Sequence, residues 1–235
     1  MTTIASNLQA VRAGIITASV SAGRAATDIS LLAVSKTFPA TALREACQAG
    51  QTRFAESYVQ EAMDKIAALH GLPIEWHFIG PIQSNKTRLI AEHFAWVHSV
   101  DRLKIAERLS AQRPVHLPPL QLCLQVNISH EASKSGVMPD QVSDLAQAIA
   151  RLPNVTLRGL MAVPAPADDV SVQRAAFAQL RELQDQLNRQ GLQLDTLSMG
   201  MSDDFSAAIA EGATMVRVGS AIFGNRIYQE AGQQV

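Results

Sequence analysis

Hydrophobic residues recur with two different periods along the chain. Near the start, Ile4, Leu8, Val11 and Ile15 have the spacing of one face of an amphipathic helix. From residue 29 onward, short apolar runs rich in β-branched residues alternate with longer segments of helical spacing. The pattern therefore predicts one leading helix, followed by strands that alternate with helices.

The strand-then-helix alternation repeats eight times, which implies parallel strands joined by right-handed crossovers. An open doubly wound sheet usually stops at about six strands. Eight such units in about 250 residues are typical of a closed barrel. We predict an α/β fold: a single (β/α)8 TIM-like barrel domain over residues 1–235, with an extra N-terminal helix. The predicted strands are 29–36, 52–57, 75–80, 96–100, 120–128, 156–163, 196–201 and 214–224.

Composition excludes several classes of partner. The 235 residues are 47% hydrophobic and carry a formal net charge of -1, with no basic cluster. We therefore expect no nucleic acid and no membrane as partner, and a monomer. No apolar run approaches the roughly 18 residues of a membrane span, and residues 1–14 lack the pattern of a signal peptide. Cys47 and Cys123 are interpreted as buried thiols in a reducing compartment. We expect a soluble cytoplasmic protein.

Lys36 is the first candidate for chemistry, because it ends the first predicted strand. It shares a face with Leu32 and Val34, so it should be partly buried, and in such a barrel the strand ends line the site. Burial and nearby cations lower the pKa of a lysine and make it a nucleophile for carbonyls. The alternative is a lysine that extends from the strand end to a loop carboxylate. Position alone leaves both open.

The last two units carry a second group of candidates. Arg217 and Gly219 point the same way, and Ser220 adds a hydroxyl. In the preceding unit, Ser202 follows Met201 and is a suitable N-cap for the next helix. Loops after strands seven and eight are a frequent phosphate site of this barrel.

Two aspartates bear on that interpretation. Asp203 and Asp204 fall in the predicted first turn of the same helix, where their charge repels an anion, so we expect their side chains to turn outward. The alternative is that Ser202 only caps its helix.

The histidines and a P-loop-like stretch give weaker evidence for a functional site. The six histidines form no metal-ligand pair, and only His77 lies in a strand with a plausible inward face, so we expect no metal. Residues 80–87 resemble a phosphate-binding P-loop. However, Asn85 stands where the second glycine belongs, and Pro81 removes an N–H. We do not expect a nucleotide there.

Taken together, the chain resembles the pyridoxal-phosphate homeostasis proteins (the YggS/PROSC type) over nearly its whole length. The family has the fold of the alanine racemase N-terminal barrel and binds pyridoxal phosphate. The resemblance rests on several motifs in the right order, which are LLAVSKTFPA, YVQE, EWHFIGPIQSNK, SKSG, RGLMAVPAP, SMGMSDD and VRVGSAIFG.

The resemblance implies roles for individual residues. Lys36 looks like the lysine that forms a Schiff base with the cofactor, and Arg217 like the residue facing the pyridine nitrogen. His77 looks like a pocket residue near the ring. The phosphate cradle looks like Ser202, Gly219 and Ser220, with the backbone of Met201.

The chain departs from the family pattern at one place. Family members usually have F-G-E-N-Y where this chain has FAESY, so Ala55 and Ser57 replace glycine and asparagine. Ser57, which we expect to contact the cofactor, keeps a hydroxyl there but loses the amide. In the SKSG loop we expect Lys134 to be either a second amine that assists cofactor transfer or a solvated lysine.

Two functions follow from the resemblance. One is a non-catalytic protein that binds pyridoxal phosphate and hands it to acceptor apoenzymes, with no catalytic residue. The other is an enzyme such as an amino-acid racemase, whose family needs a second domain carrying a tyrosine. Only NRIYQEAGQQV follows the last predicted strand, which favours the carrier. A third and weaker alternative is a barrel enzyme that acts on a phosphorylated metabolite without a cofactor.

Overall fold

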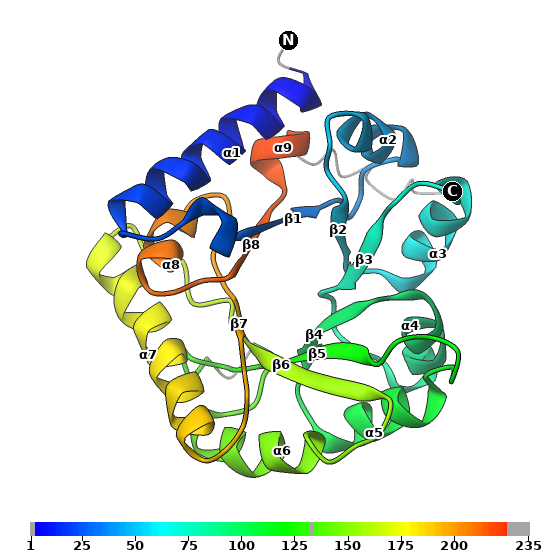
Figure 1. The fold of residues 1–235 in the computed structure, drawn as a ribbon, viewed down its shortest axis with the longest axis vertical. Helices are drawn as coiled ribbons and strands as arrows, with labels where there is room; N and C mark the ends of the chain where they lie inside the picture. Colours follow the sequence, from blue (N-terminus) through cyan, green and yellow to red (C-terminus); the bar gives the residue numbers. More distant parts are fainter. Residues whose placement is uncertain (1–2, 132–133, 225–235) are drawn as a thin grey trace, which may run out of the picture.

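Eight parallel strands form a closed barrel in the order β1 to β8, with helices around the outside (Figure 1). The computed structural model describes residues 3–131 and 134–224. Each strand pairs with the next one in the chain, and β8 pairs with β1 through Ser30 and Met215. The predicted fold class is confirmed.

The strands are shorter than the sequence pattern suggested. The predicted eighth strand ran to residue 224, but Gly219 has φ -120° and ψ -71°, outside the extended region, and a short helix follows. The strands are β1 (Ser30–Val34), β2 (Arg53–Glu56), β3 (Glu75–Phe78), β4 (Trp96–Val100), β5 (Leu120–Gln125), β6 (Val155–Met161), β7 (Thr196–Ser198) and β8 (Met215–Val218).

The helices form the outer ring in Figure 1. They are α1 (Ile4–Ser21), α2 (Ala40–Gln48), α3 (Val59–Ala68), α4 (Thr87–His93), α5 (Leu103–Gln112), α6 (Val142–Ile149), α7 (Val170–Arg189), α8 (Phe205–Ala210) and α9 (Ser220–Phe223). Short 3₁₀ turns lie at Ala26–Asp28, Ser84–Lys86 and Pro139–Gln141. No helix within the described residues is long and apolar enough to cross a membrane.

The leading helix α1 completes this ring. It packs against α8, α9 and α2, so it covers the barrel where α9 is too short to do so (Figure 1). Leu8, Val11 and Ile15 are buried and Ile4 is half-buried, as the periodicity predicted. Thr3 caps the helix through a reciprocal pair of hydrogen bonds with Ser6.

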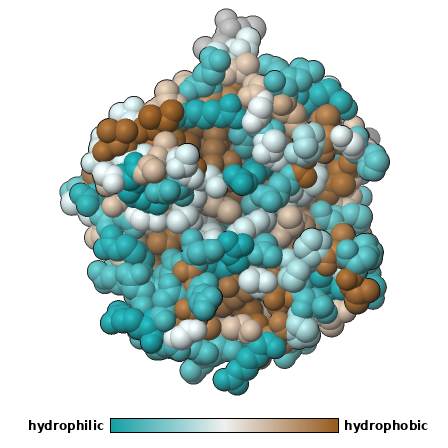
Figure 2. Space-filling view, in the orientation of Figure 1, coloured by the Kyte–Doolittle hydropathy of each residue, from teal (hydrophilic) through white to brown (hydrophobic). Residues whose placement is uncertain are grey.

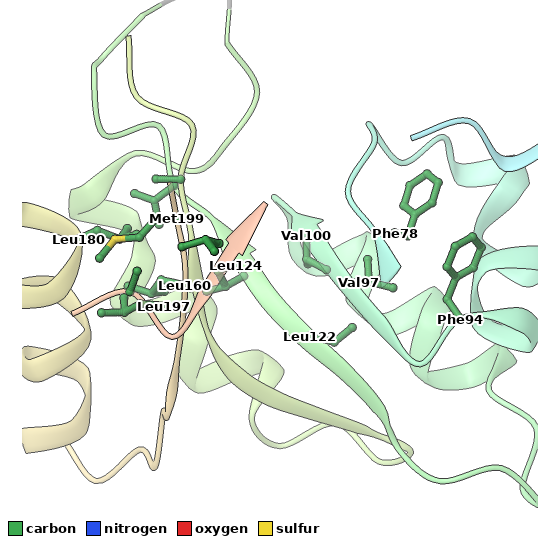
Figure 3. Close-up of a cluster of buried hydrophobic side chains, with 14 of the residues drawn as sticks. Phe78, Phe94, Val97, Val100, Leu122, Leu124, Leu160, Leu180, Leu197 and Met199 are labelled. Carbon is green, nitrogen blue, oxygen red and sulfur yellow. The ribbon is translucent and has the colours of Figure 1, made fainter. Parts of the chain in front are cut away.

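Two apolar regions stabilise the barrel. The larger lies between strands and helices, and Figure 3 shows part of it; the rings of Phe78 and Phe94 meet edge to face there, with centroids 5.3 Å apart. The smaller lies inside the barrel and consists of two clusters, one of Leu32, Val34 and Ala55 and one of Trp96, Cys123, Met161 and Met215. Strand residues therefore alternate between the two regions, and this alternation decides which side chains reach the barrel's open end.

Outside the core, the surface is unremarkable over the face shown in Figure 2. That face is mostly hydrophilic with scattered hydrophobic patches. Two of the large apolar side chains that are exposed, Val163 and Met201, belong to the pocket described below.

Candidate functional site

A pocket of about 290 Å³ lies beyond the carboxyl ends of the barrel strands. Strands β1, β2, β3, β6 and β8 and the segment between β7 and α8 contribute to it, as is usual for sites in this fold. Its wall combines apolar and polar side chains. The lining residues are Val34, Lys36, Ser57, Ile79, Met161, Val163, Met201, Ser202, Asp203, Arg217, Gly219 and Ser220.

The pocket unites almost every residue that the sequence singled out. Lys36 and Val34 share the inward face of the β1 segment, as predicted, and Lys36 is partly buried. Ser57 continues β2 and is buried at the pocket wall. Met201, Ser202, Gly219 and Ser220 also line it, and His77 is the exception.

Arg217 is held rigidly at the base of the pocket. Its side chain is buried, and it donates hydrogen bonds to the Ser198 hydroxyl (2.8 Å), the Ser198 carbonyl and the Ala162 carbonyl (2.9 Å). Burial lowers the pKa of Arg217 to about 10, so the guanidinium remains a cation at neutral pH. The pocket therefore contains a fixed positive charge.

His77 lies inside the barrel rather than at the pocket wall. Its Nδ1 is 2.9 Å from Nε2 of His98, and its Nε2 is 3.0 Å from a carboxylate oxygen of Glu75. On β3 the alternation places 75, 77 and 79 on one face, and it is Ile79 that reaches the pocket. Sequence alternation gave the correct face of the strand, but could not tell the depth along it.

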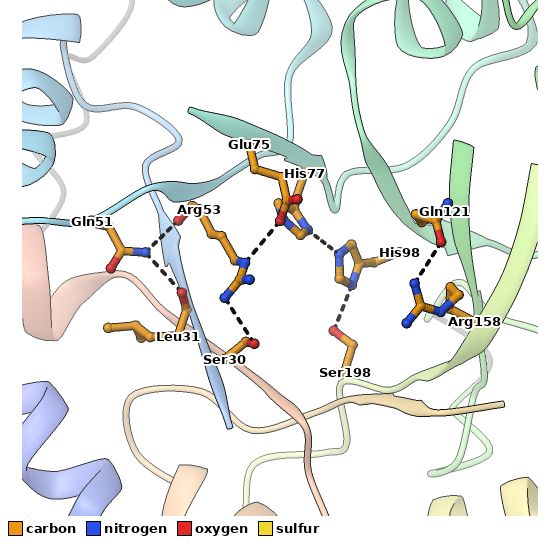
Figure 4. Close-up of polar contacts among 10 residues, drawn as sticks. All are labelled: Ser30, Leu31, Gln51, Arg53, Glu75, His77, His98, Gln121, Arg158 and Ser198. Carbon is orange, nitrogen blue, oxygen red and sulfur yellow. Dashed lines mark hydrogen bonds and ion pairs between the residues drawn. The ribbon is translucent and has the colours of Figure 1, made fainter. Parts of the chain in front are cut away.

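Hydrogen bonds run from His77 through His98 to Ser198 (Figure 4). The His98 Nδ1 is 2.8 Å from the Ser198 hydroxyl, and that hydroxyl also accepts a hydrogen bond from Arg217. The Glu75 carboxylate accepts from His77 Nε2–H, so a neutral His77 accepts at Nδ1 from His98 Nε2–H. A neutral His98 then accepts from the Ser198 hydroxyl. One consistent set of proton positions thus orients the hydroxyl beneath Arg217.

Burial favours the neutral form of both rings in the folded protein. Burial lowers the pKa of His77, although its hydrogen bond to Glu75 opposes the shift. Burial also holds the pKa of His98 well below its ordinary value, and the neighbouring His77 and Arg217 lower it further.

The segment after β7 differs from the prediction. The helix α8 begins at Phe205, so Ser202 is not its N-cap but lies in the preceding turn. There the Ser220 hydroxyl donates to the Ser202 hydroxyl at 3.2 Å, which joins the two loops across the pocket. Both serines lie where the prediction placed them, but for a different structural reason.

Asp204 does not turn away from the site, because its carboxylate accepts a hydrogen bond from the Met201 N–H at 2.6 Å. The expectation that both aspartates turn outward is therefore wrong for Asp204. Asp203 is exposed and lies at the pocket lining. Gly200 permits this turn, because it has φ 92° and an added Cβ would lie 2.6 Å from Cβ of Ala208.

Sequence reasoning missed the apolar wall of the pocket. Val34, Ile79 and Met161 form much of it, each near a strand end. Val34 lies two residues before Lys36 on the same face, so that spacing could have identified it. Ile79 and Met161 could be identified as pocket residues only once the strand lengths were known, and the sequence does not determine those lengths.

Lys134 lies near the rim. Its ammonium is 2.8 Å from the Glu131 carboxylate and 3.4 Å from the carbonyl oxygen of Val163, a pocket residue. Its role in cofactor transfer stays a prediction. Within the part of the chain that the structure describes, no three His, Cys, Asp or Glu side chains could hold a metal ion together.

Comparison with known proteins identifies the family. The profile of the family "Alanine racemase, N-terminal domain" matches residues 5–226. A pyridoxal phosphate homeostasis protein of Pseudomonas aeruginosa is 62% identical over 228 residues, which cover 97% of this chain and 98% of that protein. This chain belongs to the pyridoxal phosphate homeostasis protein family.

Two solved structures agree with this assignment. PipY of Synechococcus elongatus without PLP has a TM-score of 0.84 and 41% identity, covering 94% of this chain and all (100%) of that one. PipY with PLP bound has a TM-score of 0.82 and 39% identity, with the same coverage of 94% and 100%. The family resemblance drawn from the motifs is confirmed.

The buried histidine pair should make stability depend on pH. Because both pKa values are lowered on folding, the unfolded chain takes up protons at these rings at a higher pH than the folded protein does. The free energy of unfolding should therefore fall as the pH drops below about 6.5, by at most about 1.4 kcal/mol per pH unit for each ring. Denaturant titration across this range measures it.

The variant His98→Gln removes one of these rings. It should be less stable at neutral pH, yet show a shallower loss of stability on acidification. His116→Gln, at an exposed position, is the matched control and should keep the wild-type slope. A slope that is the same in His98→Gln and in the wild type would contradict this assignment.

Proposed function

We propose that this protein binds pyridoxal 5'-phosphate in the pocket, as a Schiff base on Lys36, and serves in cofactor homeostasis and carriage rather than catalysis. One observation carries the proposal: a single pocket contains the amine of Lys36, the cation of Arg217 and the paired hydroxyls of Ser202 and Ser220. Its volume of about 290 Å³ suits a small ligand. The PLP-bound relative supports the choice of cofactor.

Each group of the pocket suits one part of this cofactor. The Lys36 amine would hold its aldehyde carbon, and the apolar side chains of Val34 and Ile79 would contact the ring. Arg217 would face the ring nitrogen, where a cation that can only donate hydrogen bonds keeps that nitrogen unprotonated. When bound, the cofactor supplies an electron-withdrawing ring, and an unprotonated nitrogen weakens that property.

The phosphate would lie at the two serines and Gly219. Their hydroxyls can donate to phosphate oxygens, and a glycine there lets the backbone approach closely. The Met201 N–H can join them only when the Asp204 carboxylate gives up its hydrogen bond. Asp203 also lines the pocket, so two carboxylates oppose the anion and would weaken its binding.

The pocket is poorly equipped for racemisation. That reaction needs an acid or base on each face of the substrate carbon. Of the described residues that line the pocket, the ionisable ones are Lys36, Asp203 and Arg217. Tyr58 is 53% exposed and does not line it, and Tyr228 lies outside the described residues. Racemase-like activity remains the alternative, since the family profile is that of alanine racemase.

We infer that the protein delivers the cofactor to acceptor apoenzymes, as the resemblance implies. From the composition, we place it in the cytoplasm as a monomer.

The first prediction concerns Lys36→Ala. Incubation of the wild type with pyridoxal phosphate should give visible absorbance, and borohydride reduction should leave a stable adduct that peptide mass mapping places on Lys36. The variant should show neither, because no other amine occupies that position. Lys86→Ala is the matched control and should behave as wild type. An adduct mapped to Lys86 or Lys134 in the wild type would refute the assignment.

The second prediction tests the phosphate position. Gly219→Val places a branched side chain in the space that the phosphate needs, and should weaken binding at least about 100-fold, or roughly 2.7 kcal/mol. Ala221→Val, an exposed position in α9, is the control for added bulk. Spectroscopic titration measures both affinities. Unchanged affinity in a folded Gly219→Val protein would contradict the proposed position of the phosphate.

The third prediction separates carriage from catalysis. Protein loaded with cofactor is incubated with each alanine enantiomer, while chirality and keto-acid formation are followed. Conversion should not exceed about one equivalent per protein, because the opposite face lacks a positioned acid or base. Robust multiple turnover that disappears in Lys36→Ala would establish the enzyme instead.

A further inference from the structure

The residue before Lys36 is anchored on the outer side of the barrel. The Ser35 hydroxyl donates to the Glu56 carboxylate at 2.6 Å, and the Ser35 carbonyl accepts from the Lys65 ammonium at 2.7 Å. Lys36 follows in the turn after β1 and lines the pocket, so Ser35 and Lys36 lie on opposite sides of the barrel wall. The direction of the pocket lysine thus depends on groups outside the pocket.

The residue after Lys36 has an unusual backbone. Thr37 has φ 71°, in the left-handed region that β-branched residues rarely adopt. Such a conformation persists only when the surroundings impose it. The turn is closed by a hydrogen bond from the Phe38 N–H to the Ser35 carbonyl at 3.1 Å, and the Thr37 N–H within it donates to the Glu61 carboxylate at 2.5 Å.

Lys65 joins these two anchors. It is only 4% exposed, and its ammonium contacts the Ser35 carbonyl, the Glu56 carboxylate at 2.8 Å and the Glu61 carboxylate at 2.5 Å. Three acceptors match the three N–H groups of a lysine ammonium. A buried ion pair of this kind is rarely retained for stability alone, because desolvation of the charges offsets much of their attraction.

Glu56 is a second buried charged group of this network. It is fully buried at 0% exposure, and its second carboxylate oxygen has no hydrogen-bond partner among the described residues. Burial raises the pKa of Glu56, although Lys65 opposes the shift. A buried oxygen without a protein partner calls for an explanation beyond packing.

We propose that Glu61, acting through Lys65 and the Thr37 N–H, is a positioning residue that aims the Lys36 amine into the pocket. This inference rests on the proposed function, since it assumes that Lys36 reacts with the cofactor aldehyde. In that step the neutral amine adds to the aldehyde carbon, a C=N bond forms, and both amine hydrogens leave with the carbonyl oxygen as one water. A displaced amine slows the addition without changing the chemistry.

The experiment measures the rate of Schiff-base formation by stopped-flow absorbance, with borohydride mapping of the product. Glu61→Ala should slow formation about 10- to 100-fold, which is typical when a reacting group is misplaced. Glu61→Gln keeps an acceptor oxygen for Thr37 and Lys65, and should retain most of the rate. Asp64→Ala removes an exposed carboxylate from the same helix and should match the wild type.

A second variant separates misplacement of the Lys36 amine from a general loss of stability. Glycine adopts positive φ readily, so Thr37→Gly in the Glu61→Ala background should restore about 5-fold or more of the lost rate. Thermal unfolding of every variant is measured alongside. A loss of rate that follows only the loss of thermal stability, with no rescue by Thr37→Gly, would overturn the proposal.

Pyridoxal, which lacks the phosphate, provides a second readout of the amine. Glu61→Ala should slow its reaction with Lys36 by a similar factor, because the phosphate contacts are not involved. A wild type that forms no adduct on Lys36 would refute the proposed function itself. A wild type that does, together with an equally fast Glu61→Ala, would refute only the role of Glu61.

Discussion

The alternation of side chains along eight parallel strands is the constraint on which the rest of the structure depends. Because the barrel closes, every strand residue faces either the helices or the barrel interior. At the carboxyl end, the same rule sends Lys36, Ser57 and Arg217 toward one space, although they are far apart in the chain. Their outward neighbours Ser35 and Glu56 bond to each other behind the wall. One geometric rule thus supplies both the site and its supporting contacts.

Buried charge is the second feature that links the site to the scaffold. Arg217 is held by Ser198 and Ala162, and a chain of neutral rings continues from Ser198 through His98. Lys65 is held by two carboxylates and a carbonyl beside β1. A charge removed from water needs such partners, and the partners in turn fix its position. The two ends of the pocket are therefore held rigidly by separate networks.

These features support the proposal that the protein holds a cofactor rather than transforms a substrate. The site combines an amine, a cation and hydroxyls, but also Asp203 and, beside it, Asp204, whose charges oppose an anion. Under the proposed function, this opposition would let the site release pyridoxal phosphate again. In a carrier, reversible binding matters more than catalytic power, and the relatives of this chain are named for homeostasis.

The sequence alone determined the fold class, because helical and strand periodicities record which residues must be buried. It also determined the inward direction of Lys36 and Arg217, since alternation needs only local spacing. It could not determine how far along a strand the pocket begins, or where each strand ends. The prediction therefore placed His77 at the pocket, although Ile79 is the residue of this segment that lines it. The sequence likewise could not determine where the helix after Ser202 begins or which groups Glu61 contacts. These depend on contacts between distant segments, and only the closed barrel decides which segments meet.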